Sequence, residues 1–418
     1  MPSAAGAPKY RRLTQADIDE SCQRHERLWR ARPGGARAIF SFADLSGLVM
    51  KGRHLANADF SGCILRETDL SGCCLDNAGF FGADLQGAKL RYASLKRADL
   101  RGVSLRDADL TGADLFEADL REGRIASADR AQGYKLMGHT LGAADATGAN
   151  LSGANLENSM LSGMVAVQAD FSGATMKDAK LVRAVLKQAN LTGADLAGAD
   201  LSGCDLQGAN LRDAVLIGAC LTAWRVDGAV TTGMLTDAPA GISASDLPTA
   251  RMMAFHALWC ETGGKEGAPS RFDGADLRAL RSVRGYNLTA LSAQGAVFYG
   301  LDMRGVQLQG AHLEGADLRS CNLSRADLRG ARLTGARLTG SNLSGAMLGP
   351  LVLSDGRSMS AILHGVIARK TDFSAADLTR CDFSDADVER ANFTGAKARD
   401  INLTDANLVG IRGLNLFS

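Results

Sequence analysis

Five arginines lie close together in the last third of the chain, and guanidinium groups in this number suit binding to phosphate or to an acidic protein. The alternative is a solvated surface on which the arginines pair with neighbouring carboxylates, and we favour it because no aromatic residues are interleaved for base stacking. The arginines are Arg319, Arg325, Arg329, Arg332 and Arg337. The carboxylates available to them are Asp302, Glu314, Asp317 and Asp327.

Two cysteine–histidine pairs have helical spacing that would suit a metal ion. The first is Cys22 with His25, and the second is His256 with Cys260. Each histidine is also followed by a tryptophan, Trp29 or Trp259, which favours packing of a helix against the rest of the chain. We therefore interpret His25, Trp29, His256 and Trp259 as structural residues of two capping helices, and we assign no metal and no cofactor.

No arrangement typical of catalysis is visible in the sequence. There is no nucleophile–base pair and no glycine-rich phosphate loop, and aspartates recur at regular spacing, so paired carboxylates carry no catalytic signal. The chain is expected not to be an enzyme.

A five-residue repeat, which starts after the first of these helices, positions the arginines and most of the aspartates. From Gly82 to Leu120 the sequence reads GADLQGAKLRYASLKRADLRGVSLRDADLTGADLFEADL, with leucine at every fifth residue from Leu85 onward. We call the large apolar residue position i; alanine, valine or cysteine stands at i−2, aspartate or asparagine often at i−1, and glycine often at i+2. A period of five fits neither a helix nor a strand, so it predicts a repeat architecture.

Four such repeats would close a four-sided coil, so that position n+20 lies directly above position n. Residues two apart share a face, so positions i and i−2 should point inward while i−1, i+1 and i+2 point outward. One repeat cannot bury its own leucine, and stacked coils bury it together. Phe40, Phe60 and Phe80 are spaced by 20, as are Phe373 and Phe393, so each set should stack in one column.

The repeat changes register twice, each time by one residue. Central positions run to Ile125 and restart at Leu136, and a second change falls between Leu277 and Leu288. Both changes end in Gly-Tyr-x-Leu, which predicts a shared bulge that absorbs one extra residue.

The first bulge supplies candidate partner-binding residues. Arg130 falls near an inward position unless the bulge turns it outward, which we favour because an unpaired buried charge is costly. Bulges re-aim side chains beside sites, so we select Arg130 and Tyr134. Ser354–Ser360 is a further irregular stretch.

Composition indicates a globular chain without a membrane segment. The net charge is +1, 46% of residues are hydrophobic, and no run of 18 apolar residues or signal-peptide pattern occurs. Unevenly spaced cysteines, several at position i−2, indicate buried, reduced thiols and a cytoplasmic location. The cysteines at position i−2 are Cys63, Cys73, Cys204, Cys321 and Cys381.

We expect four segments along the chain. Residues 1–37 form a basic arm and a capping helix, in which Thr14 caps the helix with Asp17, and Ile18, Cys22, His25 and Trp29 form one stripe. Residues 38–230 form a first β-helix, residues 231–270 a linker with a second capping helix near 247–261, and residues 271–418 a second β-helix.

This five-residue pattern resembles the repeat of the pentapeptide-repeat family, whose consensus is A(D/N)LxX. Matching units include Ala83-Asp84-Leu85, Ala113-Asp114-Leu115 and Ala316-Asp317-Leu318. The resemblance implies an all-β solenoid made of two right-handed quadrilateral β-helices. It also implies that there is no active site common to the family. The family includes acidic DNA mimics that bind DNA gyrase and dimerise through their C-terminal ends.

Charge favours protein binding over DNA mimicry. Residues 38–229 carry 19 basic and 23 acidic side chains, whereas residues 271–418 carry 18 and 15. The acidic column Asp59, Asp99, Asp119 is interrupted by Gly79, and the column Asp69, Asp109, Asp129 by Lys89.

We therefore expect a non-enzymatic scaffold that offers flat solenoid faces to an unidentified protein partner. The alternative is an inhibitor or protector of a type II topoisomerase such as DNA gyrase. The C-terminal residues Gly413–Ser418 leave the repeat, and they either cover the last coil or join two chains as a homodimer.

Overall fold

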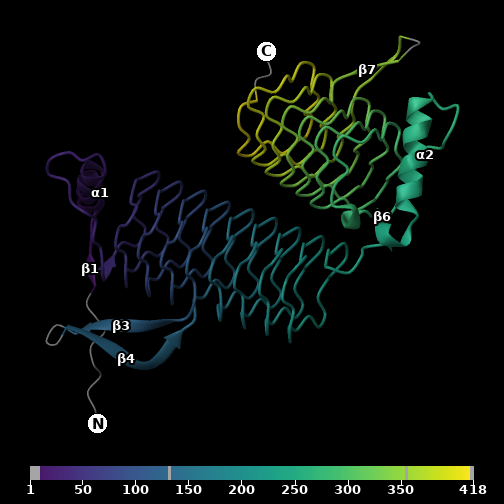
Figure 1. The fold of residues 1–418 in the computed structure, drawn as a ribbon. Helices are drawn as coiled ribbons and strands as arrows, with labels where there is room; N and C mark the ends of the chain where they lie inside the picture. Colours follow the sequence, from purple (N-terminus) through teal and green to yellow (C-terminus); the bar gives the residue numbers. More distant parts are fainter. Residues whose placement is uncertain (1–9, 130–132, 354–355, 415–418) are drawn as a thin grey trace. The chain divides into compact units, whose positions relative to one another are not determined.

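The computed structural model describes residues 10–129, 133–353 and 356–414, and the chain divides into two compact units, Met1–Ala238 and Pro239–Ser418. Each unit contains a helix followed by a solenoid of stacked coils (Figure 1). Arg130 and the residues after Leu414 lie outside the described residues.

Neighbouring coils are joined by parallel β-bridges between positions that differ by 20, such as Asp44 to Ile64 and Ile64 to Asp84. Two hydrogen bonds flank such a bridge: Leu65 N donates to Asp84 O over 2.6 Å, and Asp84 N donates to Cys63 O over 2.9 Å. Each side of a coil contributes only a short extended stretch, so long strands do not form. The predicted coil of four repeats is confirmed.

Every corner is a tight turn. At a typical corner Ala83 N donates to Phe80 O over 2.9 Å, and Gly82 has a φ of 62°. This left-handed conformation is one that glycine adopts without steric cost.

Aspartate and asparagine at i−1 have a local role that the repeat pattern alone did not predict. The side-chain Oδ1 accepts a hydrogen bond from the backbone N–H two residues on, as in Ser71 N to Asp69 (2.9 Å) and Ser152 N to Asn150 (3.0 Å). This is an Asx-type bond that fastens the corner.

The solenoid interiors are apolar. The inward positions i and i−2 are occupied by buried leucine, phenylalanine, alanine and cysteine in two separate cores, one in each unit. The predicted phenylalanine columns are confirmed: the ring centroids lie 4.8 Å apart for Phe60 and Phe80 and 5.2 Å apart for Phe373 and Phe393.

In the first unit, strand β1 (Arg11–Arg12) pairs in parallel with β2 (Ala43–Asp44), and helix α1 (Gln15–Trp29) follows β1. Thr14 caps α1 in a capping box with Asp17, as predicted. Of the predicted stripe, Ile18, Cys22 and His25 are buried, whereas Trp29 is 60% exposed.

In the second unit, β5 (Ile242–Ser243) pairs in parallel with β6 (Ala275–Asp276). The 3₁₀ turn η1 (Ala244–Asp246) leads into helix α2 (Thr249–Glu261). Figure 1 shows α2 alongside the first coils of this unit.

The first register change is a hairpin rather than a one-residue bulge. Strands β3 (Gly123–Asp129) and β4 (Gly133–Gly142) pair antiparallel, and the bridge across the insertion joins Ser104 to Asp145 instead of positions that differ by 20. Ile125 and Leu136, predicted as inward central positions, lie in the hairpin.

The second register change is local, as expected, but it lies upstream of Gly285–Tyr286. Bridges join Asp276 to Val297 and then Ser282 to Asp302, so one extra residue is absorbed between them. The 3₁₀ turn η2 (Arg278–Leu280) and Arg281, whose φ is 58°, fill this interval. The two Gly-Tyr-x-Leu segments therefore do not share a mechanism.

A second insertion lies near the C-terminal end. Strands β7 (Leu351–Val352) and β8 (Ser358–Met359) form a small antiparallel hairpin, and the bridge beside it joins Arg332 to Ile362. The irregular stretch expected at Ser354–Ser360 falls within this projection, although residues 354 and 355 are outside the described residues.

Candidate partner-binding surfaces

The five arginines of the second solenoid lie on different sides of the coil. Arg337 stands in the bridge column of Asp317, whereas Arg332 belongs to the column of His312. Arg319 follows Asp317 and so shares a side with Arg337, Arg325 is on the next side with Asn322, and Arg329 follows Asp327 on the side after that. The structure does not gather these arginines into one patch.

Four of the five form ion pairs with carboxylates named in the solvated alternative. Arg319 and Arg329 each contact the preceding aspartate over 2.6 Å, and Arg332 Nε lies 2.9 Å from Glu314. Arg337 Nη2 is 3.9 Å from Asp317. Asp302 pairs with Arg304 instead, over 2.6 Å.

The acidic columns of the first solenoid are interrupted and neutralised. Bridges place Asp59, Gly79, Asp99 and Asp119 in one column, as predicted. Within it, Arg101 contacts Asp99 over 2.7 Å and Arg121 contacts Asp119 over 2.8 Å. In the other column Asn150 follows Asp109, so the placement of Asp129 there was wrong; Asp129 ends β3.

Hydrogen bonds also hold aspartates elsewhere in both solenoids in the ionised form. The hydroxyl and N–H of Ser46 lower the pKa of Asp44. The guanidinium of Arg304 lowers the pKa of Asp302 to about 2. Such carboxylates are committed to the coil's own corners and partners, which leaves less free negative charge for a cationic site on another molecule.

The hairpin β3–β4 is the largest departure from the coil in the described residues. Its two strands form a separate two-stranded sheet, so each has an outer edge without a strand partner in that sheet. Tyr134 lies on β4 opposite Ala128. An unpaired edge offers backbone N–H and C=O groups to another chain.

The two helices use histidine in the same way at the start of each solenoid. His25 Nδ1 accepts a hydrogen bond from Ala38 N over 3.0 Å, and His256 Nδ1 accepts one from Ser270 N over 2.8 Å. His25 Nε2 also lies 3.0 Å from Ala56 O, so it donates there. Burial lowers the pKa of both histidines, which keeps them neutral.

This use of the ring nitrogens leaves His25 unable to bind a metal with Cys22. Burial raises the pKa of Cys22 to about 11, which also disfavours the thiolate. Within the described ranges, no group of three or more potential ligands is placed to hold a metal ion.

Sequence reasoning missed one partner of the first helix. The Trp29 ring lies against His54, with centroids 4.1 Å apart, and His54 stands on the first coil rather than on the helix. His54 is the first residue of its bridge column. Its place in the coil that the helix was expected to cover was the signal available in the sequence. Trp259 lies beside His256, with centroids 5.9 Å apart.

A groove of about 630 Å³ runs between α2 and the first coils of the second unit. Its lining is mainly apolar and includes Met253, Ala257, Val283 and Tyr286, with Glu261 at the C-terminal end of α2. Of the helices that the structure describes, none has the length and apolar character needed to cross a bilayer.

The repeat grammar, the four-sided coils and the Asx-fastened corners define a pentapeptide-repeat solenoid. The family model for pentapeptide repeats, in eight copies, matches residues 38–80, 83–121, 149–188, 189–223, 287–319, 321–349 and 361–395. These segments make up more than half of the chain, which therefore belongs to the pentapeptide-repeat family.

Solved structures of pentapeptide-repeat proteins are similar to this chain. Rfr23 from the cyanobacterium Cyanothece 51142 is 31% identical, with 32% of this chain and 91% of that chain covered and a TM-score of 0.27. HetL from Nostoc, a protein involved in heterocyst differentiation regulation, is 22% identical, with coverages of 92% and 94% and a TM-score of 0.16.

Full-length QnrB1, a plasmid-mediated fluoroquinolone resistance protein, is 21% identical, with 48% of this chain and 92% of that chain covered and a TM-score of 0.23. A search of curated proteins found no match. The matching family model describes a repeat and is not that of a catalytic family.

Proposed function

We propose that this chain is a non-enzymatic scaffold that binds a protein partner in the cytoplasm through its outer surface. One observation carries the proposal: the two described insertions into the coils, β3–β4 and β7–β8, are hairpins outside the solenoid cores, while the solenoid interiors are filled by apolar side chains. The polar and charged groups that could bind a partner therefore lie on the outer surface.

The hairpin β3–β4 is the principal contact in this proposal; Tyr134 lies on β4, and Arg130 falls between the two strands in the sequence, outside the described residues. Its strands offer an edge for β-augmentation, in which a partner strand adds to an exposed sheet edge. The arginines of the second solenoid have a secondary role, because their ion pairs leave little unmatched charge. Of these five arginines, Arg325 alone forms no ion pair with another described residue.

We also propose that α1 and α2 cap the first coils of the two β-helices, with domain boundaries as expected at 38–230 and 271–418. The support is the matching histidine bond to the first coil residue in each unit. At the other end of the second solenoid, Leu408 is 37% and Val409 is 49% exposed, so the terminal coil needs either a local cover or a second chain.

Action on a type II topoisomerase remains the alternative function. It is less well supported, because arginines neutralise the longest acidic column. DNA gyrase supercoiling measured with a large molar excess of the chain separates the two: inhibition or quinolone protection supports the alternative, and unchanged gyrase activity removes it.

Capture experiments with matched variants test the principal proposal. Deleting residues 123–143 removes β3–β4 and joins Glu122 to Ala144, which restores the regular spacing between bridged positions. Deleting residues 351–360 removes β7–β8 in the same register-preserving way and serves as the control. A partner bound by the full chain and by the control, but lost with residues 123–143, supports the proposal; a partner retained by all three contradicts it.

A further inference from the structure

Helix α2 carries an apolar outer face that its packing does not explain. Met252 and Met253 pack against the solenoid core and His256 is buried, so they form the inner side. On the other side, Phe255 is 45% exposed and Leu258 is 37% exposed. A helix that is apolar all round is normally buried on all sides.

The corresponding helix of the first unit shows that the position itself does not require this face. Helix α1 exposes charged residues, including Glu20, Arg24 and Arg27. Both helices use an inner histidine towards the first coil of their unit. Helix α1 also exposes two apolar residues, Leu28 (48%) and Trp29 (60%), but they lie at its C-terminal end, whereas the exposed Phe255 and Leu258 lie within the central turns of α2.

The apolar surface extends beyond the helix. Tyr286, on the neighbouring coil, is 51% exposed and lines the groove beside Ala254 and Ala257 of α2. An exposed apolar helix continued by an apolar groove is typical of an interaction site.

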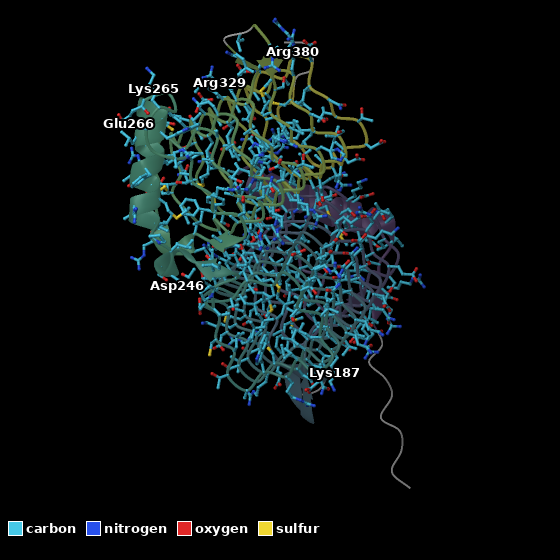
Figure 2. All side chains as sticks on the ribbon, turned by 90° about the vertical axis from the view of Figure 1, so that its right-hand side faces the viewer. Lys187, Asp246, Lys265, Glu266, Arg329 and Arg380 are labelled. Carbon is cyan, nitrogen blue, oxygen red and sulfur yellow. The ribbon has the colours of Figure 1, made fainter. Side chains whose placement is uncertain are left out.

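The charges of α2 identify the occupant. Arg251 and Glu261 are the two charged residues of the helix, and both are exposed. They are ten residues apart, or about 15 Å along the axis. Figure 2 shows the nearby Asp246 at one end of the helix and Lys265 and Glu266 at the other.

We propose that α2 binds α2 of a second copy of this chain, antiparallel, through Ala254, Phe255 and Leu258. An antiparallel pair centred on residue 256 brings each Arg251 to the Glu261 of the other copy, whereas a parallel pair would oppose like charges. The opposed helix dipoles add to this preference. A two-fold axis relates the copies, so the contact closes as a dimer.

The contact is short, because thirteen residues of helix span about 20 Å. It falls below the area of a standard interface, so we expect a dissociation constant of about 10–100 µM. Sedimentation velocity over about 5–500 µM spans that range and is the appropriate measurement.

Substitutions separate this interface from others. Leu258→Glu should weaken dimerisation at least tenfold, while Leu28→Glu, which alters an exposed leucine of α1, should leave it unchanged. Leu408→Glu tests the terminal coil of the second solenoid in the same way. Circular dichroism melting confirms that each variant is folded.

Charge reversal tests the antiparallel arrangement. Arg251→Glu should weaken the dimer, and Arg251→Glu with Glu261→Arg should restore it to within about twofold, because the reversed pairs again have opposite sign. A chain that is monomeric over the whole range overturns the proposal. So does a dimer dissolved by Leu408→Glu but not by Leu258→Glu, or one in which the double reversal fails to restore association.

Discussion

Removing the hairpin β3–β4 without disturbing the coils should leave the first solenoid stable. Deletion of residues 123–143 joins Glu122, at i+2, directly to Ala144, at i−2. Ser104 and Asp145, which already form a bridge, then have the same separation along the chain as the bridged pair Asp84 and Ser104. Each inward and outward position after the junction keeps its side.

The expected change in stability follows from loop closure. Closing a loop of this length costs about 3 kcal/mol in chain entropy, which the deletion recovers. The hydrogen bonds between β3 and β4 are lost in exchange. We therefore expect the melting temperature to stay the same or to rise by a few degrees.

A deletion longer by one residue is the matched control. In the intact chain Asp145 forms an ion pair with Arg106. Removal of residues 123–144 moves Asp145 to the inward i−2 position. A buried carboxylate without a partner costs about 3–5 kcal/mol, which corresponds to a fall of about 10 °C in melting temperature.

Differential scanning calorimetry of the full chain and the two deletions is the assay. Equal destabilisation by both deletions would refute this account, because it would mean that the hairpin holds the coils together or that register does not control stability.

Three further predictions concern the interior and the helix contacts. Leu196→Ala, at a fully buried central position, should lower the free energy of unfolding of the first unit by about 2–5 kcal/mol in denaturant titrations, whereas the outward Ala197→Ser should change it little. The lowered pKa values of His25 and His256 mean that the unfolded chain binds protons more readily, so stability should be complete above about pH 6.5 and fall as the pH drops below it; His25→Gln with His256→Gln should flatten that dependence between about pH 5 and 7 in thermal melts. Burial raises the pKa of Cys63, Cys73 and Cys204 to about 12, whereas hydrogen bonds from Ser202 and Thr222 lower that of the exposed Cys220. Maleimide should therefore label Cys220 in the native chain and the three buried thiols only after unfolding, and rapid native labelling of Cys204 would contradict the core assignment.

The coil was predictable because its inward residues recur with a fixed period. Leucine at i and alanine at i−2 share a face, and phenylalanines at the same position of successive coils must stack, as Phe60 and Phe80 do. The role of Asp69 and its equivalents in fastening corners was not visible, because a repeat pattern shows that a residue type recurs but not which backbone group it contacts.

The lengths of the two insertions concealed them in the five-residue pattern. The insertion at β3–β4, residues 123–143, is four whole repeats plus one residue, so it shifts a five-residue register just as a single extra residue would, and the pattern suggested a bulge. The insertion at β7–β8, residues 351–360, spans two whole repeats and produces no change of register at all. Ile125 and Leu136 fall on the expected spacing, but they belong to strands β3 and β4 of the hairpin.

The arginine cluster shows a different limit. Arg319 and Arg325 are close in sequence, but the coil turns at every fifth residue and carries them to different sides. Position within the four-sided coil, rather than separation along the chain, decides which side chains can share a surface.

Hydrogen–deuterium exchange of the full chain, with and without a protein captured by it, tests the proposed scaffold function most directly. The account predicts that the partner protects backbone amides of β3 and β4 while exchange in the solenoid interiors is unchanged. Unaltered exchange across Gly123–Gly142, with protection confined to a solenoid face, would contradict the role of the hairpin as the principal contact.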